Sequence, residues 1–339
     1  MNKYLDTLNS INPYYDKNID IYLSPPLHYR MRCEFSYKKK QYVMYDKNNR
    51  YILMSNFGLA SKPIFNIQAN LLESINKNSS ITKNLFQINF RSNNTDDVLV
   101  TLIYRKPISE MTIKYVNELS NDLNISINIR SKKYLYKTNK EDFYEILIMD
   151  NKKLKIYQSD KTFFQPNQFI YPKMYEFLEN NVTDTKDLLE LYCGTGSFTL
   201  PLANKFNKIF ASENNRESIR MLHKSISENK ISNISVARLN AEEVIEIFSG
   251  RKFNRMNDID INSFNFSHIL VDPPRSGLDS KVINLINKFK NLIYISCNPE
   301  TYIDDIKQLK NFKIKKIALF DQFANTDHLE IVSILENIN

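Results

Sequence analysis

Short apolar runs alternate with longer amphipathic stretches from about Asp187 to the C-terminus. Runs of four or five apolar residues bounded by polar loops are typical of buried strands, and the stretches between them have helical spacing. This alternation predicts an α/β fold, doubly wound around a mostly parallel sheet. The expected strands are 188–192, 208–212, 234–237, 268–271 and 292–296, the expected helices are 198–206, 215–228, 241–248, 279–289 and 301–308, and a closing antiparallel pair is expected at 314–320 and 329–335.

The first 160 residues have a different pattern, in which short strands dominate. Expected strands are 31–37, 41–45, 85–90, 98–104, 125–129, 143–149 and 155–157, with helices near 60–77 and 108–123. This order predicts an α+β domain with a largely antiparallel sheet. Because Pro166 breaks the last strand, we expect one domain at residues 1–165 and a Rossmann-like domain at residues 166–339.

Composition limits the compartment and the partners. At 339 residues the chain is long enough for two domains, and its net charge of +8 favours a polyanionic partner. Its three cysteines fit no disulfide framework and are too few to ligate an iron–sulfur cluster, so we expect no metal. No apolar run approaches the roughly 18 residues of a membrane helix, and the N-terminus has no secretory segment. We therefore expect a reduced, cytoplasmic protein that has no membrane partner.

Unusual polar loops follow three of the expected strands. They begin at Cys193, Asp272 and Cys297, and the strand before Cys297 is stopped abruptly by Asn298 and Pro299. In open α/β sheets ligands bind outside the carboxyl ends of the strands, so the three loops predict one composite active site. A cysteine at a strand mouth is well placed to attack a ligand.

The first of these loops has features of an adenosine site. Gly194 and Gly196 let the backbone approach a ligand closely. Glu213 ends the next strand, about 20 residues farther on, where a carboxylate meets the two ribose hydroxyls of an adenosine cofactor. Thr199 replaces the third glycine of the dinucleotide fingerprint, which disfavours a pyrophosphate and favours S-adenosylmethionine (SAM). The alternative is a tight turn without a ligand.

Each candidate side chain also has a purely structural interpretation. Most lone cysteines are small buried apolar residues, which suits Cys33, inside a strand, and Cys193, beneath the glycine loop, better than Cys297. Without further context, Glu330 would be a solvated carboxylate at a strand start and His328 a structural histidine.

Several motifs occur together and in order along the chain. They are FFQPN at Phe163–Asn167, DPPRSGL at Asp272–Leu278, SCNPET at Ser296–Thr301 and TDHLE at Thr326–Glu330, together with His28–Phe35, Leu85–Ile88 and Leu319–Phe323. With these motifs the sequence resembles, over nearly its whole length, the SAM-dependent RNA 5-methyluridine methyltransferases. Within that family it is most similar to the TrmA-type tRNA (uracil-5-)-methyltransferases.

Two absences favour the tRNA branch of this family. The related ribosomal-RNA enzymes commonly carry an N-terminal oligonucleotide-binding barrel and a four-cysteine iron–sulfur site, whereas this sequence starts directly with the uracil-methylase domain and has three cysteines. One position departs from the tRNA enzymes, which usually have Asn where this chain has Ser197. A serine hydroxyl can still donate and accept a hydrogen bond.

The resemblance implies a Rossmann-like SAM-dependent methyltransferase domain preceded by an α+β RNA-binding domain. It implies that Cys297 is the nucleophile that adds to uracil C6 and that Glu330 accepts the C5 proton. SAM is the expected cofactor. The expected cofactor-binding residues are Gln165, Tyr192, Gly194, Ser197, Glu213 and Asp272.

The implied product is 5-methyluridine in the T loop of tRNA. The T-loop-like arm of transfer-messenger RNA (tmRNA) is an expected further substrate, and the protein is expected to be a monomer. The expected RNA contacts are Arg30, Arg32, Phe86 and Gln87. Basic residues interleaved with aromatic rings are typical of surfaces that hold phosphates and unstacked bases. Two such runs are Arg30, Arg32, Lys38, Lys39 and Lys40 around Phe35 and Tyr37, and Arg130, Lys132, Lys133 and Lys137 with Tyr134 and Tyr136.

Three alternatives stay open. A ribosomal-RNA uracil-5-methyltransferase would share the chemistry but not the substrate. Amino methylation of adenine also uses an Asp-Pro-Pro loop, but Arg275 stands where the stacking aromatic is expected, and that chemistry has no use for Cys297. A non-catalytic protein that binds or folds tRNA would have no need for Cys297 and Glu330.

Overall fold

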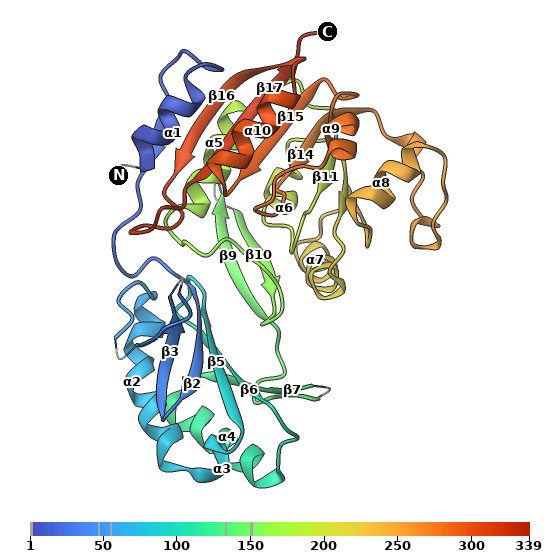
Figure 1. Ribbon diagram of the computed structural model, residues 1–339. Helices are drawn as coiled ribbons and strands as arrows, with labels where there is room; N and C mark the ends of the chain where they lie inside the picture. The colour runs from blue at the N-terminus through green and yellow to red at the C-terminus, as the bar shows by residue number, and fades with distance from the viewer. Residues whose placement is uncertain (1–2, 47, 55, 133, 150–151) are drawn as a thin grey trace. The chain divides into compact units, whose positions relative to one another are not determined.

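The structure is a computed structural model that describes residues 3–46, 48–54, 56–132, 134–149 and 152–339 (Figure 1). The chain forms two compact units. The small unit is Pro25–Ile146, and the large unit combines Met1–Ser24 with Leu147–Asn339. These bounds differ from the expected division at residue 165.

Contacts of β10 (Lys152–Gln158) explain why the large unit begins before residue 165. The backbone N–H of Tyr157 donates to Oγ of Ser225 in α7 (Arg216–Glu228), at 2.9 Å. The Asn229 side chain accepts from the N–H of Lys155 at 2.9 Å and donates to its carbonyl at 2.7 Å. A strand held to the helix in this way folds with the helix, although it precedes Pro166 in sequence.

An eight-stranded sheet forms the centre of the described part of the large unit, in the order β1-β16-β17-β15-β14-β11-β12-β13. The bounds are β1 (Asp20–Tyr22), β11 (Asp187–Leu191), β12 (Lys208–Ser212), β13 (Ile234–Ala237), β14 (Phe266–Val271), β15 (Asn291–Ser296), β16 (Phe312–Phe320) and β17 (Glu330–Asn337). Only β17 runs antiparallel to its neighbours β15 and β16. The predicted mostly parallel sheet and its closing antiparallel pair are confirmed.

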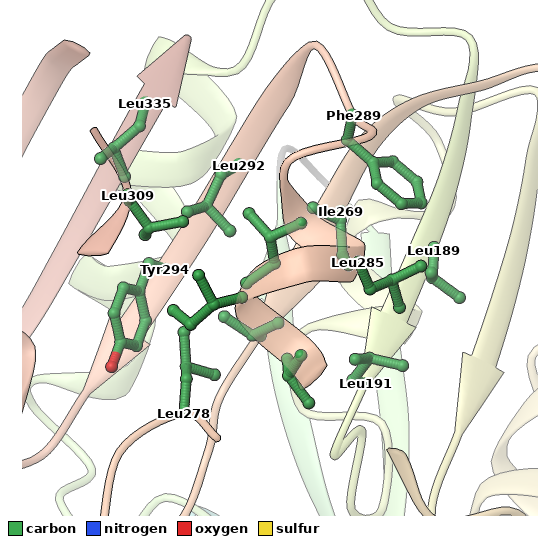
Figure 2. Packing of buried hydrophobic residues seen from close by; sticks show 14 of the residues in the cluster. Leu189, Leu191, Ile269, Leu278, Leu285, Phe289, Leu292, Tyr294, Leu309 and Leu335 are labelled. Atoms are coloured by element: carbon green, nitrogen blue, oxygen red, sulfur yellow. The ribbon is translucent and has the colours of Figure 1, made fainter. Parts of the chain in front are cut away.

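Helices and apolar side chains cover both faces of this sheet. The helices are α1 (Lys3–Ile11), α5 (Tyr171–Asn181), α6 (Thr199–Leu202), α7, α8 (Ala241–Phe248), α9 (Ser280–Ile286) and α10 (Pro299–Gln308). Side chains alternate along a strand, so Leu189 and Leu191 of β11 join one apolar cluster while Leu188 joins the other. Figure 2 shows the first cluster, in which Leu189 and Leu191 lie with Leu285 of α9. A core on both faces is why these strands consist largely of apolar residues.

The N-terminal segment of the large unit was not predicted from the sequence. Strand β1 pairs parallel with β16, matching Tyr22 to Phe320, and the two rings stack with centroids 4.6 Å apart. With three residues, none of them buried, β1 has no pattern from which a strand can be recognised. Residues far apart in the sequence thus complete one sheet.

The small unit has a seven-stranded sheet in the order β4-β3-β2-β5-β6-β7-β8. Its elements are β2 (Arg32–Lys38), β3 (Gln41–Tyr45), β4 (Tyr51–Leu53), α2 (Lys62–Lys77), α3 (Ser79–Thr82), β5 (Leu85–Ser92), β6 (Val98–Tyr104), α4 (Glu110–Leu123), β7 (Ser126–Ser131) and β8 (Tyr134–Lys137). All pairs are antiparallel except β6 with β7, which α4 connects. This confirms the predicted largely antiparallel α+β unit. Strand β9 (Phe143–Met149) pairs with β10 in a separate two-stranded sheet.

Candidate active site

The three polar loops lie at the same edge of the large sheet. Strands β11, β14 and β15 are adjacent, and their register matches Leu191 with Val271 and Val271 with Tyr294. The residues that follow these strands, from Tyr192, Asp272 and Cys297 onward, therefore leave the sheet side by side.

Hydrogen bonds connect the Cys297 loop to the Asp272 loop. Asn298 caps α10 by accepting from the N–H of Glu300 at 3.1 Å, which starts the helix directly after Cys297. Its Nδ2 donates to the carbonyl of Arg275 at 3.2 Å, and Oγ1 of Thr301 donates to the same carbonyl at 3.4 Å. Two donors on one carbonyl fix the position of the Arg275 backbone relative to the cysteine.

Glu330 enters the site from β17. The antiparallel register of β15 and β17 ends at Ser296 and Ile331, so Cys297 and Glu330 occupy the next position on each strand. The Glu330 residue is 3% exposed. Burial, with the nearby charge of Asp272, raises the pKa of Glu330 well above its usual value, and the charge of Arg275 opposes that shift.

The cysteine is electrostatically coupled to the same groups. Burial first, and then the charges of Glu330 and Asp272, raise the pKa of the Cys297 thiol to about 11, while Arg275 acts to lower it. Burial also raises the pKa of Asp272 to about 7. The half-buried Cys297 thiol, the buried Glu330 carboxyl, the half-buried Asp272 carboxyl and the Arg275 guanidinium thus lie close together. Perturbed groups that cluster at a strand edge are typical of a reaction site.

A chain of amides leads from Asp272 to the turn after β16. Nε2 of Gln165 donates to Oδ2 of Asp272 at 3.5 Å, and Oε1 of Gln165 accepts from Nε2 of Gln322. Asn167 secures the same turn, because its Nδ2 donates to the carbonyl of Gln322 at 3.2 Å. Sequence reasoning included Gln322 in a motif but assigned it no role in the site.

The glycine loop follows a left-handed backbone path that fits close approach of a ligand. Tyr192, Gly194 and Gly196 have φ angles of +62°, +56° and +89°. A Cβ on Gly196 would stand 2.4 Å from Cδ1 of Leu222, whereas one on Gly194 would meet nothing within 4 Å. Gly196 is therefore required by both its backbone angle and its packing against α7.

Glu213 and Ser197 lie on either side of this loop. The N–H of Gly194 donates to Oε2 of Glu213 at 3.2 Å, and the N–H of Asn215 donates to Oε1 at 2.7 Å. The carbonyl of Ser197 accepts from the Tyr171 hydroxyl at 2.6 Å. The structure thus brings Tyr192, Gly194, Ser197 and Glu213 together around one loop.

A further acid, missed from the sequence, lies under the loop. Glu190 of β11 is 1% exposed, and its Oε2 has no hydrogen-bond partner in the part of the chain that the structure describes. Burial raises its pKa to about 8; the nearby Thr199 hydroxyl opposes this shift, and the charge of Asp272 adds to it. An acid within an apolar strand is a signal that could have identified it.

The proposed RNA contacts lie in the small unit. Nε of Arg30 donates to the carbonyl of Arg32 at 2.8 Å, and Arg32 forms an ion pair with Glu34. The Arg105 guanidinium lies 5.3 Å from the centre of the Phe86 ring, and Nε2 of Gln87 donates to Oδ1 of Asn89 at 2.8 Å. All of these contacts are within the protein, so the roles of Arg30, Arg32, Phe86 and Gln87 in RNA binding stay predictions.

One feature of the expected basic and aromatic runs is wrong. Phe35 and Tyr37 are buried in the core of the small unit, because alternate side chains of β2 point into it, so their rings are not free to stack on bases. Tyr134, in contrast, is 42% exposed. Lys133 of the same run lies outside the described residues.

The described ranges also show how the cysteines, the potential metal ligands and the helices are arranged. Cys33, Cys193 and Cys297 are free thiols, and burial raises the pKa of Cys33 to about 12. Within those ranges, no three His, Cys, Asp or Glu side chains are arranged to hold a metal ion. None of the helices described is both long and apolar enough to cross a membrane.

Comparison with known proteins identifies the family. Residues 2–338 match the model of the tRNA (Uracil-5-)-methyltransferase family. The chain belongs to this family. The resemblance seen in the motifs is thereby confirmed.

Individual relatives agree with this assignment. A tRNA/tmRNA (uracil-C(5))-methyltransferase from Saccharophagus degradans is 37% identical and is matched over 97% of this chain and 93% of its own length. One from Campylobacter lari is 41% identical, over 93% and 92%. The crystal structure of Pyrococcus abyssi tRNA (uracil-54, C5)-methyltransferase with S-adenosyl-L-homocysteine has a TM-score of 0.75 at 19% identity, covering 98% of this chain and 82% of that one. This likeness confirms the Rossmann-like methyltransferase fold.

Proposed function

We propose that this protein methylates C5 of the T-loop uridine in tRNA with SAM, giving 5-methyluridine, and that it also acts on tmRNA. The observation that carries this proposal is the position of Cys297 and Glu330, one residue beyond the last matched pair of β15 and β17, next to Asp272 and Arg275. A thiol and a buried carboxyl group are the two reactive groups that methylation of a uracil carbon requires.

The residues around the glycine loop fit SAM. Glu213 lies beside the Gly194 amide, where a ribose diol can be held. A buried oxygen without a partner in the described structure, Oε2 of Glu190, suits a cationic ligand. Gln165 and Asp272 would hold its amino and carboxylate groups or the edge of the uracil, and Tyr192 and Ser197 would complete the site. When bound, SAM supplies the methyl group as an electrophile and becomes S-adenosyl-L-homocysteine.

The thiol of Cys297 begins the chemistry. Uracil C5 is too weak a nucleophile to be methylated directly. The thiolate forms a bond to C6 with its own electron pair, and the π pair of the 5,6 double bond moves onto C5, conjugated with the C4 carbonyl as an enolate. Burial and then the neighbouring carboxylates raise the pKa of the thiol, and Arg275 provides the opposing positive charge. Arg275 therefore favours the reactive thiolate.

Glu330 completes the cycle. After C5 has formed its bond to the methyl group, the C5–H bond breaks and the carboxylate of Glu330 takes the proton. The electron pair then expels the Cys297 thiolate from C6 and restores the 5,6 double bond. A raised pKa makes Glu330 a stronger base than an exposed glutamate.

The small unit supplies the RNA-binding surface in this proposal. The target uridine must leave its stack before Cys297 can reach C6. Arg30 and Arg32 would hold phosphates, and Phe86, Gln87 and exposed Tyr134 would contact unstacked bases. Because the catalytic and cofactor residues all come from one large unit, we propose that the protein acts as a monomer. We also propose that it acts in the cytoplasm.

Nucleoside mass spectrometry provides the test. The protein is incubated with SAM and, separately, with unmodified tRNA, tmRNA and ribosomal-RNA transcripts. Formation of 5-methyluridine in the T loop of tRNA supports the proposal, and a matched transcript with cytidine at that position should remain unmodified. Methylation confined to ribosomal RNA, or tRNA binding without methylation, would contradict it.

A further inference from the structure

The Gln322 side chain is held in the site by only one of its two polar atoms. The residue is 0% exposed and follows β16, with its N–H donating to the carbonyl of Phe320 at 2.8 Å. Its Nε2 donates to Oε1 of Gln165, but its Oε1 has no partner among the residues that the structure describes. An unpaired buried acceptor destabilises a fold, so packing alone would favour an apolar side chain here.

The hydrogen bond from Gln322 determines the direction of the next amide. An amide has a donor end and an acceptor end. Because Oε1 of Gln165 faces the donor on Gln322, its Nε2 faces Oδ2 of Asp272. Without that donor only the long 3.5 Å hydrogen bond to Asp272 orients the Gln165 amide, so the amide can turn over more readily. It would then present an oxygen to the Asp272 carboxylate, which repels it.

We propose that Gln322 is a positioning residue for methyl transfer, because it fixes the direction in which Gln165 presents its amide to Asp272 and to the ligand beside them. This inference rests on the proposed function. Asn167 keeps the Gln322 backbone in place through the 3.2 Å bond to its carbonyl, so the turn after β16 is a rigid support for the side chain. Gln322 therefore acts through Gln165 and not by touching the reacting atoms.

A variant of similar length isolates this hydrogen bond. Gln322→Met keeps the side-chain volume and removes the donor, and kcat/KM for tRNA methylation should fall at least about tenfold. The melting temperature should change little, because the unpaired Oε1 of Gln322 disappears while the buried Oε1 of Gln165 loses its donor. Gln68→Met is the matched control, because Gln68 is also buried with an unpaired amide atom but lies in α2 of the small unit. It should leave kcat/KM within about twofold of the wild type.

A double-mutant cycle separates positioning from packing. If Gln322 acts through Gln165, then Gln322→Met should cause no further loss of kcat/KM in a Gln165→Leu background. Gln322→Asn, which shortens the side chain, should give a smaller loss that also disappears in that background. Additive losses, or a Gln322→Met enzyme with the kcat/KM of the wild type, would overturn the proposal. Failure of both Gln322 variants to fold would assign Gln322 to the core and would also overturn it.

The wild-type reaction distinguishes this inference from the proposed function. A wild-type protein that does not methylate tRNA contradicts the function itself. A wild-type protein that does so, with Gln322→Met equally active, contradicts only the role of Gln322.

Discussion

Cys297 and Glu330 stand one residue beyond the last matched pair, Ser296 and Ile331, of two antiparallel strands. Backbone hydrogen bonds between β15 and β17 fix the two positions relative to each other. The proposed nucleophile and proton acceptor, held in this way, do not depend on the conformation of a long loop. This arrangement suits a reaction in which both must reach neighbouring carbons of one ring.

Replacing the nucleophile should separate catalysis from cofactor binding. Cys297→Ala should abolish methylation while leaving SAM affinity within about twofold, because the thiol acts on the uracil and not on the cofactor. Isothermal titration with SAM and nucleoside mass spectrometry measure the two effects. Cys33→Ala and Cys193→Ala, which alter buried packing cysteines, should retain measurable turnover. Full activity of Cys297→Ala would exclude its role.

The charges around Cys297 should control its reactivity in the free enzyme. Asp272→Asn removes a carboxylate that raises the pKa of the thiol, so alkylation by iodoacetamide at pH 8 should become faster. Arg275→Met removes the opposing positive charge and should make alkylation slower. Rates are followed by mass spectrometry of the Cys297 peptide. Rates that change in the reverse directions would contradict the electrostatic account.

Ionisation of Glu190 should lower the free energy of unfolding as pH rises. Its pKa is 4.5 before burial and about 8 in the folded protein, so the folded state holds its proton more tightly than the unfolded chain. The resulting stabilisation is complete below pH 4.5 and is lost as pH rises toward 8. Glu190→Gln should therefore flatten the fall in melting temperature between about pH 5 and pH 9. Glu228→Gln, at the exposed end of α7, is the control and should not flatten it.

The two loop glycines should differ in their tolerance of alanine. Both have positive φ angles, but only at Gly196 would a Cβ come within 2.4 Å of Leu222. Gly196→Ala should therefore cost more stability than the roughly 1–3 kcal/mol of backbone strain, and should weaken SAM binding. Gly194→Ala should show the strain alone. Thermal unfolding and SAM titration of the two variants make the comparison, and equal losses would refute it.

The sequence allowed much of the large unit to be predicted. Apolar strands and polar loops repeat there with regular spacing, and the loops that start at Cys193, Asp272 and Cys297 are recognisable because each follows a buried strand directly. Glu330 could be selected only through the family resemblance. Its position next to Cys297 depends on the register of β15 against β17, and the local sequence pattern does not determine that register.

Other features depend on contacts between distant segments. The three-residue strand β1 completes the large sheet from the N-terminus, so its role depends on β16 and not on its own pattern. Phe35 and Tyr37 are buried because they lie on the face of β2 that packs on the core of the small unit. The basic residues around them in the sequence give no sign of this burial. Gln322 was missed because glutamine is ordinarily exposed, and only the fold shows it buried against Gln165.

Replacing Glu330 by Gln should trap the protein on its RNA. Addition of Cys297 and methyl transfer do not require the C5 proton to leave, but release of the thiolate does. The most direct measurement is therefore mass spectrometry of nuclease-treated and protease-treated Glu330→Gln after reaction with SAM and tRNA. We predict a peptide containing Cys297 that carries a covalently bound 5-methyluridine nucleotide, with none formed by the Cys297→Ala, Glu330→Gln double variant. Normal turnover by Glu330→Gln, or an active Cys297 that never forms this adduct, would contradict it.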